Sequence, residues 1–212
     1  MDVAAIELVT STSQRPLKAR QQGEIRMSRR PWKDARTVAD LGNAMADWLE
    51  GRIAPCPSFC DGGPDDETRH LIPTLVACNR AGYVTTCSQP GHLPTRGCDG
   101  RTYRQRAFVK GWISDTHLLN RIRAHAKRSG ITVIAIRPGG SSHPTVPVTE
   151  ADGEVCAAVG FTPGHRRLIA SDWRGVGSNA VRELRTATQI ALVDPEWGRD
   201  TLWSALARAV YH

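Results

Sequence analysis

The sequence has few lysines and no long apolar run. Of its 28 basic residues only Lys18, Lys33, Lys110 and Lys127 are lysine, and the others are arginine. The longest apolar stretch, ITVIAI at residues 131–136, is far shorter than the roughly 20 residues that cross a bilayer. The chain does not open with a basic stretch and an apolar core, as a secretory leader does. We therefore expect a cytoplasmic protein with no membrane partner.

The motifs of several enzyme classes are also missing. The sequence contains no GxSxG nucleophile motif, no HExxH zinc motif, no GKS or GKT phosphate-binding motif and no internal repeat. Six cysteines are present, but none are paired as CxxC. Without an export signal they are expected to be reduced thiols and not disulfides. The sequence therefore predicts no particular reaction, and candidate sites have to be sought in looser groups of residues.

The charge of the chain is positive, with a formal net charge of +7 and an isoelectric point near 9.4. Two explanations remain open for its arginine-rich composition. A GC-rich genome favours arginine codons, whereas a phosphate-binding protein uses the guanidinium group because its planar fork matches phosphate oxygens. A nucleic-acid partner is therefore one hypothesis for this chain.

The first 33 residues differ in composition from the rest. They include RPLKARQQGEIRMSRRPWK, which is basic, polar and poor in periodic apolar positions. We expect residues 1–33 to form a mobile basic arm and residues 34–212 to form a single α/β domain.

Hydrophobic periodicity predicts a mixed α/β fold. The expected order is helix, helix, strand, strand, helix, three strands, helix, strand, helix. Residues 102–113 and 131–136 read as strands around a helix that ends at Gly130. This βαβ pattern predicts a partly parallel sheet with helices packed on its faces. Residues 154–161 and 166–171 are expected to form a hairpin around TPGH.

One candidate site is a zinc centre assembled from two loops. Cysteine and histidine are the ligands that structural zinc prefers, and a closed site needs four of them. If the two loops meet in space, they offer five such ligands. These are Cys56, Cys60, Cys87, His92 and Cys98. The alternative is that Cys87 ends a buried strand and the others are incidental loop thiols.

A second candidate is the polar loop SQPG, where the strand from Tyr83 to Thr86 ends. In α/β sheets, ligands bind beyond the carboxyl ends of strands. Polar side chains on the following strand are expected to face the same region. The predicted ligand-binding set is Thr86, Ser88, Gln89, Gln105 and Arg106. The alternative is that SQPG is a simple turn and Arg106 an exposed strand residue.

Two weaker candidates complete the search. The loop RPGGSSHP, at residues 137–144, follows an apolar strand and offers backbone N–H groups to an anion, although a surface loop explains it as well. Cys87 with His92, His143 or His165 offers the residue types of a nucleophile and its base, but their spacing does not require it.

The stretches LIPTLVACNRAGYVTTCSQPG, RQRAFVKGWI and DPEWGRDTLW resemble an uncharacterised actinobacterial family, one of the domains of unknown function. The resemblance covers residues 31 to 210, and its most specific parts are Asn79–Gly91 and Gln105–Arg106. It implies a bacterial cytoplasmic setting and no known activity.

Three functions are therefore kept open. The leading hypothesis is binding, with or without turnover, of a small nucleotide-like or anionic ligand around the SQPG loop. The first alternative is a nucleic-acid-associated protein of a mobile element, acting through the basic arm and the surface arginines of RIRAHAKR and HRRL. The second alternative is a zinc-stabilised interaction module without catalysis.

Overall fold

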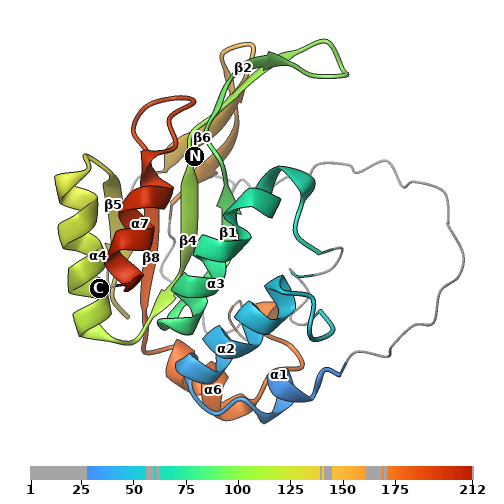
Figure 1. The fold of residues 1–212 in the computed structure, drawn as a ribbon, viewed down its shortest axis with the longest axis vertical. Coiled ribbons are helices and arrows are strands. Elements are labelled where there is room, and N and C mark those ends of the chain that lie inside the picture. The colour runs from blue at the N-terminus through green and yellow to red at the C-terminus, as the bar shows by residue number, and fades with distance from the viewer. Residues whose placement is uncertain are drawn as a thin grey trace, which may run out of the picture.

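The computed structural model describes residues 28–55, 60, 63–138, 140, 145–160, 169 and 171–211. In these ranges the chain forms helices packed on one of two small sheets (Figure 1). The helices are α1 (Arg30–Asp34), α2 (Val38–Leu49), the 3₁₀ helix η2 (Asp66–Leu71), α3 (Ile72–Arg80), α4 (Thr116–Arg128), α6 (Ser178–Leu184) and α7 (Thr201–Tyr211). The strands are β1 (Tyr83–Gln89), β2 (His92–Arg96), β3 (Thr102–Gln105), β4 (Phe108–Ile113), β5 (Thr132–Ile136), β6 (Val146–Ala151), β7 (Glu154–Val159) and β8 (Thr188–Val193).

Both sheets have four strands and only antiparallel pairs. Sheet A has the order β1-β4-β8-β5, and sheet B has the order β2-β3-β6-β7. The expectation of a partly parallel sheet is therefore wrong. Strands β4 and β5 do run in the same direction around α4, but β8 lies between them and pairs with both.

The two sheets are joined by one long, bent hairpin. Strand β1 pairs with β4 in sheet A, and the strands that follow and precede them, β2 and β3, pair in sheet B. The expected single strand 102–113 is thus two strands. The change of sheet falls between Arg106, whose N–H bonds the carbonyl of Val148, and Ala107, whose carbonyl accepts from Asp194 N–H.

Two apolar clusters lie on opposite faces of sheet A. The larger one packs α2, α3, α4 and α7 against the sheet, and Figure 1 shows α3, α7 and α4 side by side on this face. The smaller cluster joins the other face to sheet B through Phe108, Ile134 and Val193 on one side and Val148 and Val159 on the other. Side chains alternate across β4 and β8, so each strand supplies both clusters.

Local sequence signals set both ends of α2. Thr37 Oγ1 accepts from the backbone N–H of Asp40, whose carboxylate accepts in turn from Thr37 N–H, which is a complete capping box. Gly51, with φ of 71°, follows the helix. No helix among the described residues is long and apolar enough to cross a membrane.

Other local expectations differ from the structure. The partner of β7 in its hairpin is β6, which precedes it in the chain, and not the expected strand 166–171. The residues of the expected strand 166–171 that are described, Ile169 and Ser171, are helical, and the TPGH turn lies outside the described residues.

The expected boundary at residue 34 falls inside α1, whose Trp32 is fully buried. Residues 1–27 of the expected arm also lie outside the description.

Candidate functional site

Strand β1 contains a bulge at Thr86, in the segment that the sequence singles out. Thr85 pairs with Gly111 and Cys87 with Lys110, so Thr86 is an extra residue without a partner in the ladder. Ser88 pairs with Val109, which lies on the same face of β4 as Gly111. The bulge therefore turns Thr85 and Ser88 toward the same, helix-covered face of sheet A.

Gly111 permits the close contact between the strands at this point. A Cβ atom at residue 111 would lie 2.0 Å from the carbonyl oxygen of Val84, so any side chain would force the backbones apart. The bulge also keeps a hydrogen bond of its own, because Thr86 Oγ1 donates to the carbonyl of Lys110 at 3.3 Å. A bulge changes the direction of the side chains that follow it in the strand. In β1 it turns the Ser88 side chain to the face of sheet A on which the helices pack.

A cavity of about 180 Å³ lies beside the bulge, between β1, α2 and the segment before α3. We call it the β1 cavity. Its lining residues are Met45, Trp48, Leu49, Gly63, Pro64, Asp65, Thr68, Leu75, Thr85, Thr86, Cys87 and Ser88. One wall is therefore apolar and aromatic, and the opposite wall carries hydroxyl groups.

The polar groups of the β1 cavity carry little charge. Among the lining residues that the structure describes, Asp65 is the one acidic residue, and none is lysine or arginine. Thr68 is buried, and its hydroxyl donates to the carbonyl of Asp65 at 2.8 Å, which fixes the turn that leads into η2. The described part of the lining therefore offers hydrogen-bond acceptors and hydroxyls, and no cation for a phosphate.

Cys87 is among the lining residues, but the register of β1 turns its thiol to the other face of sheet A. Burial raises its pKa, and the nearby Lys110 ammonium opposes this shift only in part. Because the thiolate is the reactive form of cysteine, a raised pKa makes this thiol a poor nucleophile at neutral pH. The side chain also packs against the smaller apolar cluster.

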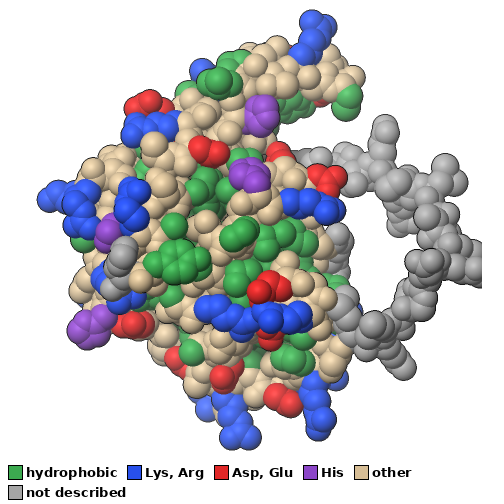
Figure 2. Space-filling view, viewed as in Figure 1, with side chains coloured by type: hydrophobic (Ala, Val, Ile, Leu, Met, Phe, Trp, Pro, Cys, Tyr) green, Lys and Arg blue, Asp and Glu red, His purple; other side chains and the backbone are tan. Residues whose placement is uncertain are grey.

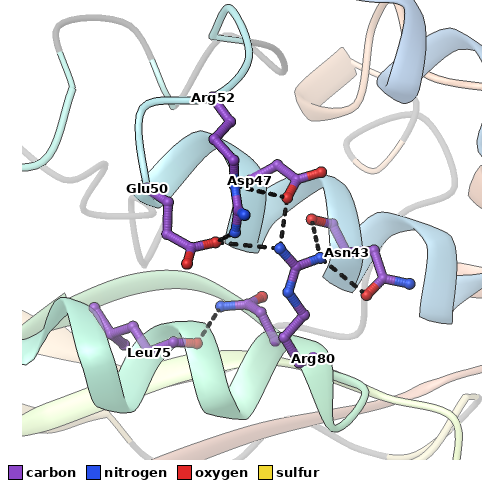
Figure 3. Close-up of polar contacts among 7 residues, drawn as sticks. Asn43, Asp47, Glu50, Arg52, Leu75 and Arg80 are labelled. Atoms are coloured by element: carbon purple, nitrogen blue, oxygen red, sulfur yellow. Dashed lines mark hydrogen bonds and ion pairs between the residues drawn. The ribbon is translucent and has the colours of Figure 1, made fainter.

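The two helices that wall the cavity are held together by Arg80 (Figure 3). This side chain extends from the end of α3 to α2, where it donates to Asp47 Oδ1 at 2.5 Å and to Glu50 Oε2 at 3.1 Å. It also donates to the backbone and side-chain oxygens of Asn43. Arg52 meets the same two carboxylates from the other side. Helix α2 thereby keeps Met45 and Trp48 in place over β1.

Gln89 does not enter the β1 cavity. Its Nε2 donates to the carbonyl oxygens of Arg106 at 3.0 Å and Val148 at 2.9 Å, and its amide also meets the hydroxyl of Thr149. These bonds connect β1 of sheet A to β6 of sheet B. The amide is thus occupied by the protein itself at the bend of the hairpin.

Gln105 and Arg106 lie at the same bend, apart from the cavity. The guanidinium groups of Arg104 and Arg106 stand over the ring of Trp197, at 4.5 and 4.3 Å from its centre. Gln105 Oε1 and Arg106 Nε are buried and have no hydrogen-bond partner among the described residues. The structure therefore brings Thr86 and Ser88 together in one place, and Gln89, Gln105 and Arg106 in another.

The segment after β8 closes this bend. The N–H of Gly198 bonds the carbonyl of Gln105 at 2.8 Å, and the N–H of Gly91 bonds Asp200 Oδ1 at 2.7 Å. Asp194 is fully buried and accepts from the hydroxyl of Thr201 at 2.7 Å. The three stretches that carry the family resemblance thus meet at one place, where they hold the two sheets together.

The predicted zinc ligands are spread over several environments. Cys60 is buried in the larger cluster, whereas His92 and Cys98 are exposed on β2 and on the turn that follows it. Cys56 lies outside the described residues. Among the residues that are described, no group of three or more His, Cys, Asp or Glu side chains is placed to hold a metal ion. The zinc site stays a prediction.

Sequence reasoning missed half of the β1 cavity. Trp48 and Met45 read as core residues of α2, and Asp65 and Thr68 read only as part of a loop and a helix cap. Their one common signal is position, because Trp48 precedes and Asp65 follows the stretch IAPCPSFCDGGP, which is rich in proline and glycine. Such a stretch indicates a loop that passes near a helix end, but not what lies beneath it.

A family model described as Domain of unknown function (DUF6919) matches residues 27–212. No curated protein matches the chain.

Proposed function

The chain belongs to that family, to which no activity is assigned, and we propose from the geometry that it binds a small uncharged heterocycle in the β1 cavity. The observation that carries this proposal is the bulge at Thr86, which directs the hydroxyl side of β1 toward a cavity. A concave site with an apolar wall and a few converging polar groups is the usual form of a small-molecule site.

The size of the cavity limits the ligand to a compact molecule. A protein cavity of about 150 Å³ accommodates benzene. The β1 cavity, at about 180 Å³, therefore suits one ring system with polar substituents, such as a nucleobase. The side chain of Trp48 supplies an aromatic surface for such a ring.

The charge of the lining narrows the ligand further. The Ser88 hydroxyl serves as donor or acceptor, whereas the Thr86 hydroxyl, which donates to the Lys110 carbonyl, serves as an acceptor. The carboxylate of Asp65 accepts from a ring N–H or an amino group. No lysine or arginine is among the described lining residues, so these residues favour an uncharged ligand over an anion. The sequence predicted a nucleotide-like or anionic ligand around the SQPG loop. For the β1 cavity we therefore propose the uncharged ring of such a ligand, without its phosphate.

This proposal concerns recognition and includes no reaction. Among the described lining residues Cys87 is the one thiol, and burial raises its pKa. Gln89, Gln105 and Arg106 take part indirectly, because they hold the bend that follows the bulged strand.

Calorimetric titration with nucleobases, their nucleosides and the corresponding 5′-monophosphates tests this proposal. We expect at least one base or nucleoside to bind, and its monophosphate to bind less tightly. Ser88→Leu fills the cavity and is expected to abolish binding, whereas Ser204→Leu, on the exposed side of α7, is the matched control. No binding by any of these probes, or equal binding by the Ser88→Leu protein, would refute the proposal.

A further inference from the structure

The outer side of the helical layer has a charge pattern unlike the rest of the molecule. Helices α4 and α7 contain no aspartate or glutamate. They carry five basic residues, namely Arg121, Arg123, Lys127, Arg128 and Arg208. We call these five residues the basic face. The chain as a whole has 21 acidic residues for its 28 basic ones, so the absence of acids from two neighbouring helices is a local asymmetry.

The cations of the basic face are not used by the fold. None of its five residues makes an ion pair with a described residue, whereas Arg80, Arg101, Arg104 and Arg199 all do. Arg121, Lys127, Arg128 and Arg208 are exposed. In Figure 2, basic and histidine side chains gather over the position of α4.

The ordinary role of cations at a helix end explains only part of this pattern. Lys127 and Arg128 lie in the last turn of α4, where positive charge stabilises the helix dipole. Arg121 lies two turns earlier, outside the range of that effect. The acid nearest to α4 in sequence is its N-cap Asp115, which lies about 9 Å along the helix from Arg121 and about 20 Å from Arg128.

We propose that the basic face binds the phosphate backbone of double-stranded DNA. Uncompensated arginines on an exposed helix match a row of phosphates, because release of condensed counterions drives such contacts. An exposed α-helix also has the dimensions that the major groove admits. Helix α4, which carries four of the five cations, contains no phenylalanine, tyrosine or tryptophan on which an unpaired base would stack, and this favours a duplex over a single strand.

The test uses the full chain and a fluorescently labelled duplex two helical turns long. Binding is followed by anisotropy at several salt concentrations for the wild-type protein and two triple variants. The first variant, Arg121→Gln with Lys127→Gln and Arg128→Gln, removes three cations from the basic face. The matched control, Arg69→Gln with Arg96→Gln and Arg182→Gln, removes three exposed cations elsewhere. All three proteins keep residues 1–27, so a contribution from that segment cancels in the comparison.

We expect the basic-face variant to bind the duplex about tenfold more weakly or worse. The slope of the logarithm of its binding constant against the logarithm of salt concentration should be less steep by about 1 for each phosphate that it no longer neutralises. The control variant keeps most of the affinity. Equal weakening of DNA binding in both variants would show that only the net charge of the protein matters, and would overturn the proposal. So would a wild-type protein that does not bind the duplex at low salt. Binding to phosphatidylserine vesicles without binding to DNA would assign the face to a membrane and also overturn it.

Discussion

Asn79 and Thr85 are joined by two hydrogen bonds in the interior of the protein. Asn79 Nδ2 lies 2.7 Å from Thr85 Oγ1, and the backbone N–H of Thr85 donates to Asn79 Oδ1 at 3.0 Å. Asn79 is fully buried and also donates to the carbonyl of Leu75. The pair fastens the end of α3 to β1 immediately before the bulge, and so fixes one wall of the β1 cavity.

Replacement of Asn79 by alanine is expected to lower the free energy of unfolding by about 2–4 kcal/mol. The change leaves the Thr85 N–H buried without an acceptor, which costs more than the hydrogen bond itself contributes. Urea denaturation measures the loss. Asn120→Ala, on the exposed side of α4, is the control and should cost nothing. Equal stability of the two variants would contradict the structural role of Asn79.

Replacement of Gly42 by alanine tests the contact between α2 and α3, because the contact decides whether the free energy of unfolding rises or falls. Alanine in place of glycine within a helix normally stabilises it by about 0.5–1 kcal/mol. In this protein a Cβ at residue 42 would lie 2.2 Å from the carbonyl oxygen of Asn79, so α2 and α3 would have to separate. We expect Gly42→Ala to destabilise by about 1–3 kcal/mol in the same urea assay. A stabilised variant would show that the two helices are not in contact there.

Gln89 and Ser88 are neighbours with different expected roles. Gln89→Ala removes the amide that bonds the carbonyls of Arg106 and Val148, and should cost about 1–3 kcal/mol of stability. Ser88→Ala removes a cavity hydroxyl without a bond among the described residues, and should cost less than about 0.5 kcal/mol. Thermal and urea unfolding compare the two, and the reverse order of stability would contradict the assigned roles.

Tyr83 makes stability depend on alkaline pH. Burial raises its pKa well above the usual value, so the folded protein keeps the phenol protonated after the unfolded chain has begun to lose the proton. Its contribution is fully present below the unfolded pKa of about 10 and is lost as pH rises toward the folded value, by about 1.4 kcal/mol per pH unit. Tyr83→Phe, measured by urea unfolding from pH 8 upward, should lack this component of the slope. An unchanged slope would contradict it.

Features set by nearby residues were predictable from the sequence. Thr37 and Asp40 lie three residues apart, so the capping box that begins α2 depends on no distant contact. The same holds for α4, and for β5 as an apolar segment bounded by Gly130 and Pro138.

Features set by pairing over long distances were not predictable. Thr188–Val193 follows Phe108–Ile113 by more than seventy residues, yet it inserts between β4 and β5 and makes the sheet antiparallel. Nothing in the apolar run ITVIAI indicates which strand is its neighbour. Likewise, the alternation of residues 102–113 continues through the change of sheet at Arg106 and Ala107.

The candidate site was predictable only in part, because its residue types are local but their directions depend on long-range pairing. Thr86 and Ser88 stand out as polar residues at the end of an apolar strand, but their direction depends on the bulge opposite Gly111. Gln89 looks equally available in the sequence. Its amide is used by carbonyls of residues 106 and 148, which only the folded chain brings near.

Methionine NMR tests the central claim, that the β1 cavity binds a small heterocycle, most directly. The chain has three methionines, and of these only Met45 lies within the described residues, where it lines the cavity and is 2% exposed. In protein labelled with ¹³C at the methionine methyl groups, Met45→Leu assigns the Met45 signal. We predict that a base or nucleoside that binds by calorimetry shifts this signal saturably. Binding that leaves the Met45 signal unmoved would contradict the account.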